Sequence, residues 1–567
     1  MKSPFTAIIV LFAATAVSAQ PAELRQYLTE VQRVQLDRSV PAVVELCTRL
    51  DDQVSRLVAA GHMAPWRVQP GETESYFYFT DPYELVLILS RARPCLSPAV
   101  AAQAAEYLAR HIAEYPVGLV ALLPHDQGRF REVYDLPPEQ RTFRYRRWLW
   151  RSLNTRPRMM AFYAMWAYAD AFNQWTIIEQ QYPQLVLLFE QQYGTRTNLL
   201  EEAVGLAAFA RLATYMGDSA RAERALAGAV ELLAQQSSVE EMNRRARIRY
   251  DANTKTQGGR AMFRPLLYPV VNITPESARF LAERHKDDIR RETEQMMRRW
   301  PLWYVPLPPH GDPLFGEGCS MAPDIRPNIM LSRAMVLEDP LEELMRDLDI
   351  PALPVGDLFY IQTLTALIER AGSRAYSAYQ PPRRAVAFGP ADEKRIEDLR
   401  QYLASIATAP WKISRPFPNP KNESFDRPLD PETGAVPGTA AGDALGWRDL
   451  RMSDHSADLR QVIDGDATGV LAYAWTRVYS PRHVTGHLLL RNDDPLAAWV
   501  NGREVLRNRE GLGWMPGEDR APVTLEEGWN TVLLKLDQAG GGWVFSAKFV
   551  TPGGAPLEGL RFSTETK

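Results

Sequence analysis

The spacing of hydrophobic residues changes once along this chain, near residue 410, and that change most constrains the fold. Before this point apolar residues recur at helical spacing, as at Val100, Ala104 and Leu108. After it, short runs alternate apolar and polar residues and are separated by turns such as Asn501-Gly502. The sequence therefore predicts an all-α region followed by an all-β region.

Length and composition are those of a globular protein with more than one domain. The chain has 567 residues, 46% of them hydrophobic and 24% charged, which excludes a mostly disordered polymer. Its 65 Lys and Arg against 69 Asp and Glu leave a net charge of −4. This balance gives no overall field that favours nucleic acid or acidic membranes. We predict three segments: 1–19, 20–409 and 410–567.

The first residues have the pattern of a secretory signal. One positive charge at Lys2 precedes an apolar run from Phe5 to Val17, and the small residues Ser18 and Ala19 follow. The run is shorter than the roughly 20 residues that a transmembrane helix needs. We therefore expect cleavage after Ala19, a secreted or periplasmic location, and no membrane span in the mature protein.

Only three cysteines occur in the chain, Cys47, Cys95 and Cys319. This number allows at most one internal disulfide and excludes a disulfide-rich scaffold. Cysteine and histidine residues are also too scattered for a zinc site. We expect no required cofactor and no metal ligand set. Asp464-Gly-Asp466 and Asn492–Asp494 are oxygen-rich enough for structural calcium, although Asx turns explain both segments as well.

The segment 20–409 predicts about a dozen helices. Start and stop signals include Met216-Gly217 before Asp218, and Thr274-Pro275-Glu276 at the start of a helix expected to run to Trp300. The main predicted helices cover 98–114, 159–173, 177–192, 198–215, 220–233, 274–300, 357–371 and 391–406. Short loops between neighbours predict antiparallel pairs, as in an α/α toroid. A helical repeat protein is the competing fold, but no 34-residue period is present.

The segment 410–567 predicts an antiparallel β-sandwich, because short alternating runs follow one another between turns. The predicted strands are Gly469–Val478, His487–Arg491, Ala497–Val500, Val523–Leu525, Thr531–Leu536 and Trp543–Val550. Trp411–Pro420, Ala498–Val505 and Glu527–Asn530 resemble parts of the galactose-binding-like β-sandwich often appended to bacterial carbohydrate-active enzymes. The resemblance implies that 411–445 belongs to the sandwich. It implies less about ligand binding, since these residues are mostly turn and core.

The helical segment resembles, more loosely, the α/α-toroid polysaccharide lyases and glycosidases. The resemblance rests on Tyr163–Asp170, Gly205–Leu212 and Gly356–Gln362. It implies a helical catalytic domain that acts on a polysaccharide. The Asn-Asn-His signature of the better known alginate lyases is not matched.

The segment from Arg141 to Arg158, RTFRYRRWLWRSLNTRPR, is the most unusual in the chain. It holds seven arginines interleaved with aromatic residues. Arginine forks match carboxylate geometry and aromatic faces stack on sugar rings, so the segment predicts an anionic polysaccharide as partner, and no nucleic acid. A solvated helix with its tryptophans in the core is the competing interpretation. The residues proposed to bind substrate here are Arg147, Trp148, Trp150 and Arg156, and Asn154 is proposed to neutralise the substrate carboxylate.

A second candidate segment surrounds Tyr268. Between Gly258 and Pro269 the sequence places Arg260 and Arg264 near Tyr268, next to a proline that restricts its backbone. A uronic-acid polymer is cleaved by β-elimination when a base removes the proton α to a neutralised carboxylate. Neighbouring arginines favour the phenolate form of a tyrosine. We therefore predict Tyr268 as base, with Arg264 neutralising the substrate; a packing role for Tyr268 is the alternative.

The remaining predicted site residues are His310 as acid or base, and Glu317 and Tyr163 in substrate binding. The leading function is thus a secreted polysaccharide lyase. The first alternative is a glycoside hydrolase, which needs two carboxylates, with Asp170, Glu201, Glu202, Glu317 and Asp357 as candidates. The second alternative is a non-catalytic glycan-binding surface protein.

Overall fold

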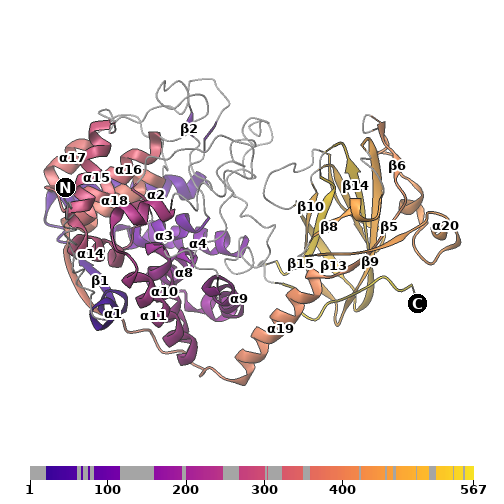
Figure 1. Ribbon diagram of the computed structural model, residues 1–567, viewed down its shortest axis with the longest axis horizontal. Coiled ribbons are helices and arrows are strands. Elements are labelled where there is room, and N and C mark those ends of the chain that lie inside the picture. Colours follow the sequence, from indigo (N-terminus) through magenta and orange to yellow (C-terminus); the bar gives the residue numbers. More distant parts are fainter. Residues whose placement is uncertain are drawn as a thin grey trace, which may run out of the picture.

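The computed structural model combines a helical region with antiparallel sheets. It describes residues 21–60, 66–67, 75–76, 82–114, 159–194, 199–246, 267–271, 273–299, 303, 322–348 and 358–566, the last range without 421–422, 454–455, 464–467, 493, 510–518, 541 and 553–555. We call residues 21–407 the helical region and residues 410–566 the sheet region (Figure 1). The predicted mixture of α and β structure is confirmed, and so is its order along the chain.

The described helices of the helical region lie close to the predicted ones. The longer ones are α1 (Pro21–Thr29), α2 (Pro41–Ala60), α3 (Pro82–Ala92), α4 (Pro98–Glu114), α8 (Met160–Phe172), α9 (Trp175–Gly194), α10 (Leu200–Met216), α11 (Ser219–Ala234), α14 (Pro275–Arg284), α15 (Lys286–Arg299), α16 (Ala322–Leu331), α17 (Leu341–Leu348), α18 (Leu358–Ala371) and α19 (Pro390–Ala407). A four-residue helix, α13 (Tyr268–Val271), precedes α14.

The predicted start and stop signals operate as expected at two places. Gly217 takes a φ of 81° after α10, a left-handed conformation that glycine adopts at little cost. The Asp218 carboxylate then accepts a hydrogen bond from the Arg221 backbone and caps α11. Thr274 caps α14 through the Ser277 backbone, with Pro275 at the first helical position.

One predicted helix is wrong in length. A single helix was expected from Thr274 to Trp300, but α14 ends at Arg284 and α15 begins at Lys286. His285 between them has φ −136° and ψ 19°, outside helical geometry. Charged residues dominate α15, so the periodicity of apolar residues gave no sign of the break.

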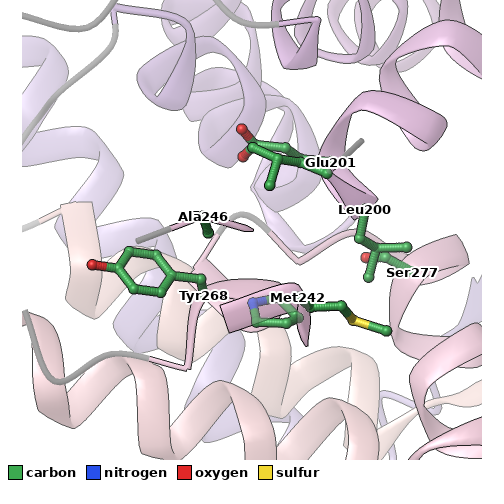
Figure 2. A pocket seen from close by; sticks show the side chains of 8 residues that line it. Leu200, Glu201, Met242, Ala246, Tyr268 and Ser277 are labelled. Atoms are coloured by element: carbon green, nitrogen blue, oxygen red, sulfur yellow. The ribbon is translucent and has the colours of Figure 1, made fainter. Parts of the chain in front are cut away.

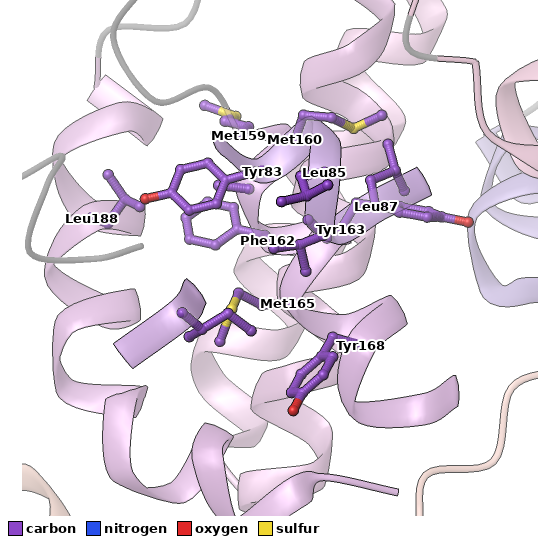
Figure 3. Packing of buried hydrophobic residues seen from close by; sticks show 14 of the residues in the cluster. Tyr83, Leu85, Leu87, Met159, Met160, Phe162, Tyr163, Met165, Tyr168 and Leu188 are labelled. Carbon is purple, nitrogen blue, oxygen red and sulfur yellow. The ribbon is translucent and has the colours of Figure 1, made fainter. Parts of the chain in front are cut away.

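The centre of the helical region is packed by aromatic side chains from α8, α9 and α10. All residues from Met160 to Ala169 are buried, and Phe209 of α10 contacts Phe162 and stacks on Phe189 at a centroid distance of 4.2 Å. Figure 3 shows this packing around Phe162 and Tyr163. Gly205 lies where α10 crosses the start of α8, and a Cβ there would be 2.4 Å from the Met159 carbonyl oxygen. The two helices therefore approach closely only because position 205 has no side chain.

A small sheet in the helical region was not predicted. Strand β1 (Glu30–Gln35) pairs antiparallel with β4 (Ser373–Ala378), and the register joins Glu30 to Ala378 and Gln35 to Ser373. Both strands are short and polar, with few buried residues. Such strands lack the alternation that identifies a half-buried strand in a sequence.

The sheet region has a four-stranded sheet, order β13-β10-β15-β8, and an eight-stranded sheet, order β12-β11-β14-β9-β5-β7, where β6 and β16 also pair with β9. The described strands of these two sheets pair antiparallel with their neighbours. They are β5 (Pro410–Ile413), β6 (Phe417–Pro418), β7 (Arg448–Arg451), β8 (Ala457–Asp458), β9 (Val470–Ser480), β10 (Val484–Asn492), β11 (Leu496–Val500), β12 (Arg503–Asn508), β13 (Asp519–Leu525), β14 (Gly528–Gln538), β15 (Val544–Val550) and β16 (Arg561–Ser563).

The turns and the opening strand of the sheet region follow the sequence signals. Asn501 and Gly502 both have positive φ, 51° and 77°, as a two-residue hairpin between β11 and β12 requires. Trp411 is buried in β5 and packs edge-on against Phe545. Asn492 donates to the carbonyls of Asp494 and Pro495, which is the turn role considered for it. Asp464 and Asp466 lie outside the described residues.

Helix α19 connects the two regions, as Figure 1 shows. Its Tyr402 donates a hydrogen bond to the Phe549 carbonyl of β15 at 3.0 Å, so the end of the helix is fixed to the sheet region. Within the described residues, no helix has the length and apolar character needed to cross a membrane. Residues 1–19, the predicted signal, lie outside the description, as does Cys319; Cys47 and Cys95 are buried free thiols.

Candidate functional site

Most of the predicted site residues lie outside the described part of the chain. Only Tyr163 and Tyr268 are described. The eight others are Arg147, Trp148, Trp150, Asn154, Arg156, Arg264, His310 and Glu317. The site is therefore built from the two tyrosines and their neighbours.

Tyr268 is the first residue of α13, and two asparagine side chains bind the backbone of Leu267 and Tyr268. Asn243 accepts a hydrogen bond from the Tyr268 backbone N–H at 3.0 Å. The buried Asn328 of α16 accepts from the Leu267 N–H at 2.9 Å and donates to the Leu267 carbonyl at 3.1 Å. These bonds satisfy backbone groups that a four-residue helix leaves unpaired. The position of the Tyr268 Cα is thus set by two other helical segments.

Tyr268 lines a pocket of the helical region. The lining residues come from the start of α10, the helical turn at 239–246, α13 and α14, and they are Leu199, Leu200, Glu201, Met242, Ala246, Tyr268, Pro269 and Ser277. In Figure 2 the Tyr268 ring extends away from Met242 and Ser277, and its hydroxyl lies apart from the Glu201 carboxylate. A half-buried tyrosine and a half-buried glutamate therefore line one largely apolar pocket.

The two glutamates at the start of α10 have different roles. Glu202 is 3% exposed, and its carboxylate accepts a hydrogen bond from the Leu199 backbone N–H at 3.2 Å. It therefore caps its own helix. Glu201, one residue earlier, lines the pocket. Among the described acids that are candidates for hydrolysis, which are Asp170, Glu201 and Glu202, only Glu201 lines this pocket.

A buried polar network lies directly behind this pocket. Glu276 is the residue before Ser277, and its side chain is 2% exposed. One carboxylate oxygen accepts from the Tyr163 hydroxyl at 2.7 Å and the other from Arg211 Nη2 at 2.8 Å. Glu276 and Ser277 are adjacent in α14. Glu276 binds Tyr163, and Ser277 lines the pocket together with Tyr268, so α14 connects the surroundings of the two tyrosines.

Arg211 is held in this network by aromatic rings as well as by Glu276. Its guanidinium carbon lies 4.2 Å from the ring centroid of Trp166 and 5.7 Å from that of Tyr379. Its Nη2 also donates to the Leu28 carbonyl at 3.1 Å. Within the described part of the chain its Nε and Nη1 form no hydrogen bond. Cation–π attraction compensates part of the cost of burying this charge.

Tyr163 is 3% exposed. Burial, together with the neighbouring Glu276 charge, raises the pKa of Tyr163 well above its ordinary value, because both disfavour the phenolate. Tyr163 therefore stays protonated and donates to Glu276. In this structure it orients the network behind the pocket and does not line the pocket.

A second ion pair fixes the start of α14. Arg91 pairs with Glu369 at 2.8 Å, and its Nη1 donates to the Ile273 carbonyl at 2.6 Å, next to the Thr274 cap.

Asp170, another acid considered for hydrolysis, pairs with Arg33 at 3.3 Å. Glu317 and Asp357 lie outside the described residues.

Sequence reasoning missed Glu276 and Arg211 as parts of the site. Thr274-Pro275-Glu276 was interpreted only as a helix start, and Glu276 as an acid near the positive helix end. Arg211 was part of Gly205–Leu212, interpreted as a packing pattern. An arginine within an otherwise apolar helical run was the available signal, because such a residue needs a buried partner.

Over the described residues, no group of three or more His, Cys, Asp or Glu side chains is arranged to hold a metal ion. The expectation that no cofactor is required remains a prediction.

No family model matches the sequence, and comparisons with curated proteins and with solved structures give no match.

Proposed function

We propose that this protein is a secreted carbohydrate-active enzyme that cleaves an anionic, uronic-acid-containing polysaccharide by β-elimination. In this proposal the helical region is an α/α toroid that carries the catalytic site, and the sheet region is a galactose-binding-like β-sandwich. The observation that carries the proposal is Tyr268, the predicted base, on the wall of this pocket. Asn243 accepts a hydrogen bond from its backbone N–H, and Asn328 binds the backbone of the preceding residue, Leu267.

The proposed reaction uses the residues as follows. The Tyr268 phenolate removes the proton from the sugar carbon that bears the carboxylate. The carbon–oxygen bond to the neighbouring sugar then breaks, a carbon–carbon double bond forms, and the leaving oxygen takes up a proton. No water is consumed. Asn154 and Arg156 or Arg264 neutralise the carboxylate, His310 acts as acid or base, and Trp148 and Trp150 stack on the sugar.

Preorganisation supports this role for Tyr268. A catalytic base acts best when its neighbours hold it in place. The two asparagines bind backbone groups of Leu267 and Tyr268, and the Tyr268 side chain lines the pocket. The buried Tyr163–Glu276–Arg211 network fixes α14 on the adjacent wall. Tyr163 thus supports the site as a positioning residue.

The test is to incubate the purified protein with glucuronan, alginate and pectin and to follow the ultraviolet absorbance of the unsaturated product. We expect absorbance to rise with at least one polymer. Tyr268→Phe should lower the rate by roughly 10²-fold or more, because a general base contributes that much. Tyr168→Phe is the matched control, since its hydroxyl donates to the Ala105 carbonyl and Tyr168 does not line the pocket. Full activity in Tyr268→Phe removes Tyr268 from the mechanism.

Glycoside hydrolysis is the second candidate, and Glu201 on the pocket wall favours it. Hydrolysis consumes water and releases reducing ends without the ultraviolet signal. In that case Glu201→Gln, and not Tyr268→Phe, should abolish activity. Binding of the polymers with neither product would leave the non-catalytic glycan-binding protein.

A further inference from the structure

The eight-stranded sheet carries apolar side chains on both faces. Along β9, Ala474 and Val478 belong to the main hydrophobic core, whereas Tyr473 and Trp475 belong to a second cluster. Successive strand residues point to opposite faces, so the second cluster lies on the other face of the sheet. Phe417, Leu429, Val436 and Trp447, from the chain before β9, pack against this cluster.

The same face ends in an exposed aromatic residue. Trp529 of β14 is 43% exposed, and it is the one aromatic among the large hydrophobic residues that are exposed in the described chain. Its partner in the register is Tyr479 of β9, two positions beyond Arg477 on the same face. The side chains packed on this face therefore bury it around Tyr473 and Trp475, whereas the face is exposed at Trp529.

Two arginines stack on this aromatic pair. The Arg477 guanidinium carbon lies 4.7 Å from the Trp529 ring centroid, and that of Arg561 lies 4.1 Å from the Tyr479 centroid. The two rings meet edge to face with centroids 5.5 Å apart. We call these four residues, Trp529, Tyr479, Arg477 and Arg561, the Trp529 patch.

Stacked guanidinium groups use their faces on the rings, while their N–H donors point outward in the plane of the group. Arg477 Nη1 donates one such bond to the Glu565 carbonyl at 2.7 Å, which fixes its orientation. An exposed indole beside two arginine cations matches a ligand with an apolar ring face and a carboxylate. Rings of this kind bind sugar faces, and arginine forks bind carboxylates.

We propose that the Trp529 patch is a binding site for a carboxylate-bearing oligosaccharide, separate from the Tyr268 pocket. The choice of a uronic-acid ligand rests on the proposed function; the location of the site rests on the patch alone. The patch holds the polymer on the sheet region while the helical region acts on it. The four patch residues belong to the sheet region, whereas the residues that line the pocket belong to the helical region.

The test measures binding of the full-length protein to an oligogalacturonate and to a neutral oligosaccharide of the same length by titration calorimetry. We expect the acidic ligand to bind, and Trp529→Ala to weaken it roughly tenfold, the size of one lost stacking contact. Arg561→Gln should weaken binding less and reduce its dependence on salt. Val386→Ala, at an exposed residue of the helical region, is the matched control and should change nothing.

The proposal is overturned by no binding by the parent protein, by equal affinity for the neutral ligand, or by an unchanged affinity in Trp529→Ala whose melting temperature is also unchanged. Tighter binding of single-stranded nucleic acid than of the acidic sugar also overturns it. The proposed lyase function is tested separately, by the ultraviolet product assay with a short oligosaccharide. Trp529→Ala should keep that activity, because Trp529 lies outside the pocket.

Discussion

The helical region and the sheet region each bury a tyrosine, a glutamate and a cation in the same arrangement. In the helical region Tyr163 and Arg211 both bind Glu276. In the sheet region Tyr473 and Lys535 both bind Glu432. In each case the tyrosine donates to the carboxylate and the cation lies near aromatic rings.

The two groups differ in how completely the cation is satisfied. Lys535 is 0% exposed, and its ammonium also donates to the Arg427 carbonyl at 2.8 Å. Burial still lowers the pKa of Lys535. Arg211 keeps two nitrogens without hydrogen bonds in the described chain. The sheet-region group fastens the segment around Glu432 onto the sheet, whereas the helical group stiffens the wall of a pocket.

Glu276→Ala should have the largest effect on stability. It leaves the buried Arg211 charge with one hydrogen bond and the Tyr163 hydroxyl with none. Breaking a buried pair in this way costs about 3–5 kcal/mol. Urea unfolding followed by circular dichroism measures the loss. The control is Glu393→Ala, which removes an ion pair from a half-exposed carboxylate and should cost less than about 1 kcal/mol; equal losses would contradict the role given to burial.

Glu432→Ala should cost less, about 1.5–3 kcal/mol, the range for a hydrogen bond to a charged group. Lys535 keeps the Arg427 carbonyl, and the covering segment can admit water to the vacated position. The same urea experiment measures the loss. A larger effect than that of Glu276→Ala would reverse the comparison between the two regions.

Two glycines test how tightly each region is packed. A Cβ at Gly205 meets the Met159 carbonyl oxygen at 2.4 Å, and one at Gly442 meets the Val436 carbonyl oxygen at 1.9 Å. Overpacking costs about 1–3 kcal/mol. We expect Gly205→Ala near the upper limit, because α8 is fixed in the core, and Gly442→Ala near the lower one, because its short segment can shift. Thermal unfolding of both variants ranks them, and Gly389→Ala, where a Cβ meets nothing within 4 Å, is the control.

The smallest expected effect is a pH dependence with one histidine in each region. Burial lowers the pKa of His285 and of His487 below the usual 6.5. Both histidines are therefore less protonated in the folded chain than in the unfolded chain below pH 6.5. Their contribution to stability is complete above that pH and is lost as the pH falls through the lowered pKa. Melting temperatures between pH 7.5 and 5 should drop less in His285→Gln and in His487→Gln than in the parent; an unchanged slope in both variants contradicts this.

The two regions also differ in how well their elements were predicted. Helices with apolar stripes and clear caps, such as α11 and α14, were expected at nearly the observed starts. So were the strands that bury one or both faces, such as β9 and β14. Strands β1 and β4 were missed because their stability comes from pairing across the chain, which leaves no periodic signal in either strand. The end of α14 was missed for another reason, since the charged residues that follow His285 in α15 leave few apolar positions from which a break could be recognised.

The candidate site was predicted only in part. Tyr268 was identified from local chemistry, and it does line a pocket. The residues that form the rest of its surroundings come from distant segments of the chain. No local sequence motif identifies Asn243, Asn328 or Glu276 as part of the site. Buried polar partners depend on which helices pack together, and a single sequence does not contain that information.

The pairing of β1 with β4 has a consequence for synthesis on the ribosome. Gln32 and Tyr376, joined by a hydrogen bond across this pair, are 344 residues apart in the chain. At about 5–20 residues per second, β1 waits some 20–70 s before its partner is translated. During that time its backbone is an open edge that other strands can join. Its polar composition, with Glu30, Gln32, Arg33 and Gln35 among six residues, protects the nascent chain from such pairing until the last part of the helical region emerges.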